Sequence, residues 1–215
     1  MGAALDAGLE AIAVADHNSF EAVKGVKEAA AGRRLHVFTG TELSTVGGHM
    51  LALLPEETPL DELGGFLDSL GIDRAGWGDA STVAAGDTGA VLKKVVERGG
   101  LAIAAHVERW PSGFLETNQS RQVKRAIHES IYLGALEITV AHNKCLWNAG
   151  KMRGYPRPRA CVQGSDAHAL EEIGRRPVYV RMAELTLEAL REGLRDYQAA
   201  VRFPDEMCLC HRGTD

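Results

Sequence analysis

The sequence lacks any run of about eighteen apolar residues, the length that a membrane-spanning helix requires. Its first ten residues have neither the basic region nor the long apolar stretch of a secretion signal. Cysteine is also scarce. There are four, and the one close pair, Cys208 and Cys210, offers too few ligands for a zinc site. These absences predict a cytoplasmic protein with reduced thiols and no membrane association.

Positive charge is in short supply as well. The 24 basic residues are outnumbered by 29 acidic ones, which gives a formal net charge of −5. The surface as a whole therefore has no electrostatic preference for nucleic acid, and only a local basic patch would provide one.

The composition is that of one compact domain, because 45% of the 215 residues are hydrophobic. We expect this domain to cover residues 1–203. The stretch from 204 to 215 has no periodicity and predicts a disordered tail. Residues 71–89 are rich in glycine and small side chains, and they predict a long loop of the kind that is often functional.

Short apolar segments alternate with segments of helical periodicity along the chain. The expected strands are Ala11–Ala15, His36–Thr39, His49–Leu53, Leu101–Ala105, Ala135–Val140, Ala160–Gln163 and Val178–Arg181. The expected helices are Phe20–Ala31, Leu60–Leu70, Thr88–Arg98, Ser120–Tyr132 and Leu187–Ala199, the last capped by Thr186. This alternation predicts an α/β fold with a parallel sheet or an α/β barrel.

Histidine or acidic residues stand at or beside the ends of five of these strands. They are His17, Glu42, His49, His106, and the pair Asp166 and His168. Each alone has an ordinary explanation as a turn, a helix cap or a buried core histidine. Because the active face of an α/β barrel lies at the carboxyl ends of its strands, their joint occurrence predicts one shared site.

Imidazole and carboxylate ligands together suit zinc, manganese or iron. A carboxylate such as Glu42 can bridge two cations, and such pairs activate water for phosphoryl displacement. The sequence therefore predicts at least one divalent metal ion, with Glu42, His106 and Asp166 as candidate catalytic residues. His36, His128 and His211 fit a structural or solvated role better, and His142 stays open as a ligand or substrate contact.

Arginines near the last of these motifs suggest a substrate clamp. Arg159 directly precedes the expected strand Ala160–Gln163, and Arg175 and Arg176 follow Asp166 and His168. Guanidinium groups match phosphate oxygens in a bidentate manner, so these three are candidate phosphate ligands. A solvated basic face is the alternative explanation.

The segments GLEAIAVADHNSF, GTELS, GGHML, AAH and GSDAH, in this order, resemble the PHP (polymerase and histidinol phosphatase) family. The resemblance implies a distorted barrel of seven strands with up to three metals. It places Glu42 between the first two metals, His49 and His106 on the second, Asp166 on the first, and His17 and His168 on the third. The family begins with a strand ending in His-x-His, which is absent before Gly8, so we expect a barrel without its first strand and impaired hydrolysis.

Three functions follow from these residues and from the resemblance. The first is a metal-dependent phosphoesterase that acts on a phosphorylated small molecule or on nucleic acid. The second is a non-catalytic metal-binding regulatory or structural module, which the missing His-x-His motif favours. Its partner would be an ATPase domain or protein, since QGSDAHALEEIGRRPVYVRM is similar to PHP domains of large ATPase-containing proteins. The third is an amidohydrolase, which also uses histidines and an aspartate at barrel strand ends.

Overall fold

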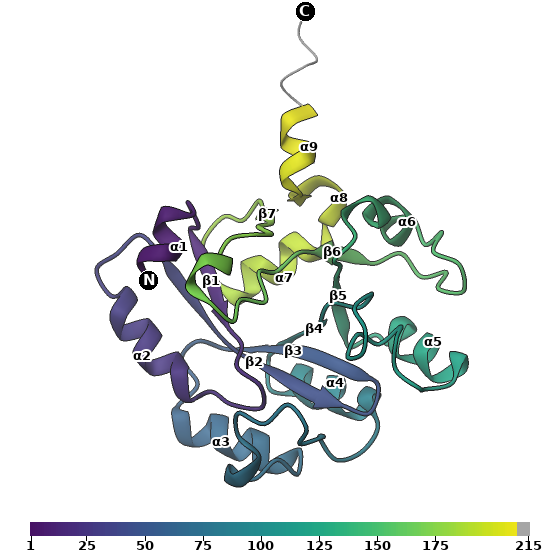
Figure 1. Ribbon diagram of the computed structural model, residues 1–215, viewed down its shortest axis with the longest axis horizontal. Coiled ribbons are helices and arrows are strands. Elements are labelled where there is room, and N and C mark those ends of the chain that lie inside the picture. The colour runs from purple at the N-terminus through teal and green to yellow at the C-terminus, as the bar shows by residue number, and fades with distance from the viewer. Residues whose placement is uncertain (210–215) are drawn as a thin grey trace, which may run out of the picture.

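A computed structural model describes residues 1–209, which form a curled six-stranded sheet surrounded by helices (Figure 1). The strands lie in chain order: β1 Ala11–Val14, β2 His36–Thr45, β3 Gly48–Leu54, β4 Leu101–Ala104, β5 Leu133–Glu137 and β6 Ala160–Val162. A separate two-stranded sheet pairs β7 Tyr179–Val180 with β8 Val201–Arg202. The curled sheet is an incomplete barrel, with β1 and β6 at its two edges.

Residues 1–209 include four short α-helices outside the predicted segments or at their ends: α1 Gly2–Asp6, α6 Lys144–Asn148, α8 Tyr197–Ala200 and α9 Pro204–Leu209. The five predicted helices form as α2 Glu21–Ala30, α3 Leu60–Ser69, α4 Thr88–Glu97, α5 Arg121–Glu129 and α7 Leu187–Arg195. Three begin at a side-chain cap, because Asp87, Ser120 and Thr186 each accept a hydrogen bond from a first-turn N–H. None of the helices within residues 1–209 has both the length and the apolar character needed to cross a bilayer.

The sheet is mixed, which the alternating pattern did not predict. The pairs β1–β2, β4–β5 and β5–β6 are parallel, whereas β3 runs antiparallel to both β2 and β4. A tight hairpin at Val46 and Gly47 joins β2 to β3, so no crossover helix is needed there. As a result, the start of β3 lies at the same edge of the sheet as the carboxyl ends of its neighbours.

The two faces of the sheet are covered differently. The outer face packs Leu43, Met50 and Leu136 against helices α2 to α6 in the larger core cluster. The inner face packs Leu53 and Ile103 against α7, through a stripe that includes Leu187 and Leu194. In Figure 1, α7 crosses the hollow of the curled sheet. Because α7 seals one end of this inner face, the polar residues at the other end are free to form a site.

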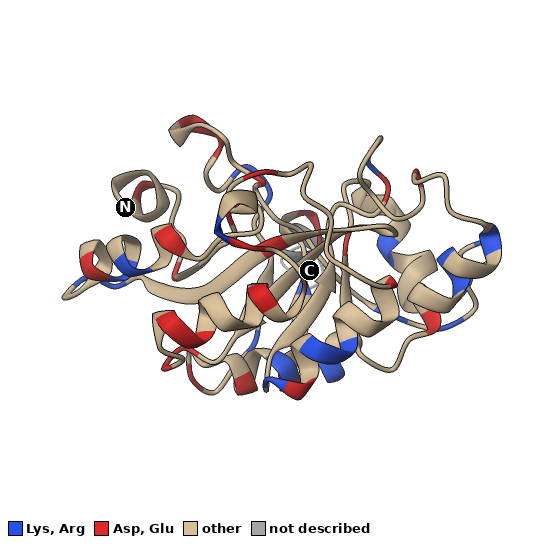
Figure 2. Cartoon of the chain, turned by 90° about the horizontal axis from the view of Figure 1, so that it is seen from below, with Lys and Arg blue, Asp and Glu red and all other residues tan. Residues whose placement is uncertain are grey.

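Two peripheral regions complete the fold. The first part of the predicted tail is the helix α9, where the Glu206 carboxylate accepts a hydrogen bond of 2.5 Å from Lys144 Nζ. Residues 210–215, including Cys210 and His211, lie outside the described part of the chain. Acidic and basic residues both occur on the helices and loops around the sheet, as expected from the modest net charge (Figure 2).

Candidate metal centre

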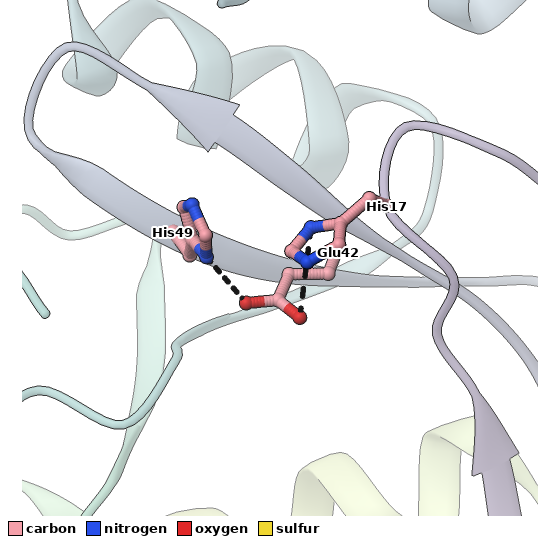
Figure 3. A group of neighbouring side chains, drawn as sticks. All are labelled: His17, Glu42 and His49. Atoms are coloured by element: carbon pink, nitrogen blue, oxygen red, sulfur yellow. Dashed lines mark hydrogen bonds and ion pairs between the residues drawn. The ribbon is translucent and has the colours of Figure 1, made fainter. Parts of the chain in front are cut away.

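Glu42 is the centre of a cluster of imidazoles at the carboxyl edge of the sheet. In the hairpin register Glu42 pairs with Leu51 and Ser44 pairs with His49, so Glu42 and His49 are diagonal neighbours on one face. His49 Nδ1 lies 2.7 Å from Glu42 Oε1 (Figure 3). The same oxygen lies 2.9 Å from Nε2 of His106, which follows β4. Glu42 therefore stands inside β2, and not after it as the sequence suggested.

His17 reaches the same carboxylate from the loop after β1. This loop continues the sheet, because Asn18 N–H donates to the Glu42 carbonyl at 2.9 Å. His17 Nδ1 lies 3.9 Å from Glu42 Oε2, the carboxylate oxygen that does not contact His49 (Figure 3). Ligand atoms of His17, Glu42 and His49 all lie within 4.8 Å of one another, a spacing that can hold one metal ion.

The loop over residues 71–87 is fastened to this site. Asn18 is fully buried, and its amide donates to the carbonyls of Asp79 and Thr82 at 2.8 Å each. Its oxygen accepts from Ser44 N–H, and Gly78 N–H donates to the His17 carbonyl. The predicted long loop therefore supports the position of His17.

The backbone is strained at the site. Among residues 1–209, the non-glycine residues with positive φ are Asn18 at 48°, His106 at 28° and Asp166 at 46°. Such conformations are costly for side chains larger than glycine and collect at functional positions. All three are predicted site residues or their immediate neighbours.

The electrostatics of the cluster favour an ionised Glu42 carboxylate beside a neutral His17 imidazole. Burial raises the pKa of Glu42, but hydrogen bonds from His106 and His49 outweigh it and leave that pKa well below its usual range. Burial lowers the pKa of His17, against the opposing charge of Glu42. His17 Nδ1 and His106 Nδ1 are buried with no hydrogen-bond partner among the described residues. An anionic oxygen beside imidazole nitrogens that have no other partner fits the ligand set of a divalent metal.

Asp166 and His168 lie in the loop after β6, beside the cluster. The Asp166 carboxylate forms an ion pair with Arg109, a residue that the sequence had not singled out. His168 is exposed, and its N–H donates to Glu172 at 2.7 Å. Asp166 and His168 both contribute to the electrostatic environment of His17, so both lie near the Glu42 cluster. The structure thus gathers four of the six predicted ligands tightly and places the other two next to them.

Glu137 is a site residue that sequence reasoning missed. It ends β5 with only 4% of its surface exposed, and its carboxylate accepts the His106 N–H at 3.2 Å. Burial raises the pKa of Glu137, and this effect outweighs the lowering of that pKa by the nearby His106. An acid closing an apolar strand was the available signal. The expected strand continues to Val140, so the sequence places Glu137 in its interior and does not mark it as a strand end.

The three predicted phosphate ligands differ in position. Arg175 and Arg176 follow the Asp166 loop and donate to the carbonyls of Ser165 and Gly164. Nη2 of Arg176 is buried and has no partner among the described residues. Arg159 instead precedes β6, at the amino-terminal ends of the parallel strands and therefore opposite the cluster. It is buried and donates to the carbonyls of His128, Ser130 and Leu133, so the prediction that Arg159 binds phosphate is wrong.

The remaining described histidines are His36, His128 and His142. His36 pairs with Glu56 at 3.0 Å at the start of β2. His128 is buried against Trp147 and Tyr155. Exposed His142 lies in a short 3-10 turn, Ala141–Asn143.

Gly164 provides a test of the hydrogen bond between Glu137 and His106. A Cβ added to Gly164 would lie 2.8 Å from Glu137 Oε1, whereas one added to Gly65 in α3 would meet nothing within 4 Å. We expect Gly164→Ala to lower the free energy of unfolding by about 1–3 kcal/mol and to weaken metal binding by moving Glu137 away from His106. Gly65→Ala should be neutral or stabilising by up to about 1 kcal/mol. Urea unfolding of the two variants compares them, and equal stabilities would contradict the close contact.

Comparison with known proteins identifies solved structures that have a similar fold. No family model and no curated protein sequence matches the chain. The lesion-specific endonuclease Q of Pyrococcus furiosus aligns over 94% of this chain with a TM-score of 0.64 and 13% identity. The alignment covers 52% of that protein, so this chain spans about half its length.

Two further solved structures are similar. A Bifidobacterium adolescentis protein assigned as a metal-dependent phosphoesterase aligns over 78% of this chain and 80% of its own, with a TM-score of 0.52 and 16% identity. An amidohydrolase from Chromobacterium violaceum aligns over 80% of this chain and 82% of its own, with a TM-score of 0.53 and 16% identity. Together these likenesses confirm the fold that the PHP resemblance implied, a distorted α/β barrel.

Proposed function

We propose that this chain is a metal-dependent phosphoesterase. The observation that carries the proposal is the convergence of three imidazoles, from His17, His49 and His106, on the buried carboxylate of Glu42. A carboxylate with several nearby nitrogen ligands at the active edge of an α/β barrel is suited to a catalytic cation.

The residues divide into metal ligands and supporting groups. His17, Glu42, His49 and His106 would hold zinc, manganese or iron, and Asp166 with His168 would hold a further ion beside them. A divalent cation there supplies a Lewis acid that activates water and stabilises charge on a transferring phosphoryl group. The Glu137 carboxylate keeps His106 in place by accepting the backbone N–H of His106.

Basic side chains support a phosphate-bearing substrate. Arg109, Arg175 and Arg176 lie along the loops that border the cluster, and each reaches Asp166 or a carbonyl beside it. Their guanidinium groups would orient phosphate oxygens at the metal edge. Arg109 would exchange its ion pair with Asp166 for the substrate when Asp166 binds metal.

The similar structures favour this chemistry over its alternatives. One is a metal-dependent phosphoesterase by assignment, and another is endonuclease Q bound to a 27-mer duplex with an abasic lesion at its active site. The likeness to an amidohydrolase keeps amide hydrolysis as the second candidate. Association with an ATPase rests on the segment QGSDAHALEEIGRRPVYVRM alone.

The test combines metal analysis with a substrate panel. Protein purified without added metal or chelator is analysed for zinc, iron and manganese, and then assayed on 4-nitrophenyl phosphate, a short single-stranded DNA and an N-acyl amino acid. We expect at least one equivalent of metal and hydrolysis of a phosphoester. Hydrolysis of the amide alone would support the amidohydrolase, and bound metal without turnover would support a non-catalytic module. Protein that takes up no metal even after reconstitution would refute the ligand assignment.

A further inference from the structure

Trp110 is an unusually exposed aromatic residue. Its relative exposure is 77%, the highest among the large hydrophobic residues of the described chain. Of the other tryptophans, Trp147 is fully buried and Trp77 is half-buried under Arg74. Tryptophan has a very large apolar surface, and the free energy gained by burying a side chain grows with that surface. An exposed tryptophan therefore gives up more burial free energy than an exposed residue of smaller size.

The loop that carries Trp110 is attached to the metal centre on both sides. It begins at His106, and the Arg109 guanidinium pairs with Asp166. Two residues after Trp110, the Ser112 carbonyl accepts the His49 N–H at 3.0 Å. A hydrogen bond from Gly113 N–H to the Arg109 carbonyl, at 2.8 Å, closes the turn. Trp110 is therefore held at the rim of the site, and the loop tip cannot move away without breaking contacts of two predicted ligands.

The neighbouring side chains give this rim a distinct chemical character. Arg109 precedes Trp110 directly and lies against the metal edge, where a phosphate would be bound. The adjacent loop presents Leu170, which is 70% exposed, in the short turn Leu170–Glu172. A cationic group next to the metal and flat apolar surface just outside it match a ligand that joins a phosphate to an aromatic ring.

We propose that Trp110 stacks on a base of an unpaired nucleic-acid strand whose phosphate lies at the metal centre. The inference rests on the proposed phosphoesterase function and narrows its substrate class to nucleotides. Every base offers a π-face to an indole, so the contact is independent of sequence. A base inside a duplex is covered on both faces by its neighbours, so the strand must be single or locally opened at this point.

The binding test uses tryptophan fluorescence. Metal-loaded protein is titrated with short oligothymidylate and, in parallel, with an equally long chain of abasic deoxyribose phosphates, which has the same charge and no bases. We expect oligothymidylate to quench the emission and to bind more tightly than the base-free chain. Trp110→Phe should remove most of the quenching yet retain part of the affinity, because a phenyl ring still stacks.

The size of the effect comes from Trp110→Ala. We expect this variant to bind oligothymidylate about 5- to 150-fold more weakly, the range that corresponds to single base-aromatic contacts. Its affinity for the base-free chain should fall less. The matched control is Ile131→Ala, because Ile131 is 75% exposed and lies before β5, at the opposite edge of the sheet.

The outcomes separate this inference from the proposed function. Equal affinities of the wild type for the two oligomers, or an unchanged affinity of Trp110→Ala for oligothymidylate, would overturn base stacking. Absence of binding would do the same and would leave Trp110 as a contact for a protein partner. Hydrolysis of 4-nitrophenyl phosphate by the wild type is measured alongside. Base-dependent quenching without hydrolysis would sustain the stacking and count against the phosphoesterase.

Discussion

Replacing Glu42 by Gln is expected to abolish tight metal binding and to lower phosphoester hydrolysis by more than about 100-fold, beyond the usual loss from a group outside the ligand set. The amide keeps the shape of the side chain but removes its charge. It also turns one of the two oxygens that face His49, His106 and His17 into an N–H donor. The variant therefore loses both a ligand and the acceptor that orients the imidazoles.

Glu56→Gln is the matched control for this substitution. Glu56 contacts His36 Nε2 at 3.0 Å, in a histidine-glutamate pair at the opposite end of β2. Metal content by elemental analysis and kcat/KM on a phosphoester should match the wild type for Glu56→Gln and fall sharply for Glu42→Gln. A Glu42→Gln protein with full metal content would remove Glu42 from the ligand set.

Removal of the metal is expected to lower the melting temperature by about 8–16 °C. Metal present at about a thousand times its dissociation constant stabilises the folded state by about 4 kcal/mol. In a domain of this length each kcal/mol moves the melting temperature by about 2–4 °C. Thermal denaturation with manganese or zinc, compared with excess chelator, measures the shift. Glu42→Gln should show almost none, and an equal shift in this variant would place the stabilising ion elsewhere.

The same shift is expected to depend on pH. Metal binds the unprotonated imidazole, whose pKa in an unfolded chain is about 6.5. Burial lowers the pKa of His17 in the folded chain, so its ring stays neutral to a lower pH than a free imidazole. The metal-induced shift should therefore be complete at neutral pH and decline only when pH falls below the lowered pKa of folded His17, which lies under the value of about 6.5 for a free imidazole. The metal-free fold loses stability in the same direction, because the unfolded chain takes up the His17 proton first. A shift of equal size at pH 5 and pH 8 would contradict imidazole ligation.

The candidate ligands could be found from sequence because strand ends are local features. A polar residue after a short apolar run stands out without knowledge of the fold, as His17, His106 and Asp166 do. The α7 stripe, with Leu187 and Leu194, was equally readable, since helical periodicity repeats within a few residues. Local pattern therefore determined the α/β class, most element positions and the set of candidate ligands.

Contacts between distant segments were decided only by the tertiary structure. The antiparallel β3 depends on a hairpin that strand-helix alternation does not encode, and it brings His49 to the carboxyl edge. Glu137 and Arg109 acquire their roles from partners 31 and 57 positions away in the chain, His106 and Asp166. Arg159 was a plausible phosphate ligand from its position in the sequence. It lies instead at the start of β6, opposite the cluster, and its guanidinium donates to backbone carbonyls. Sequence thus determined which chemical groups are present, and the direction of each strand decided which of them meet.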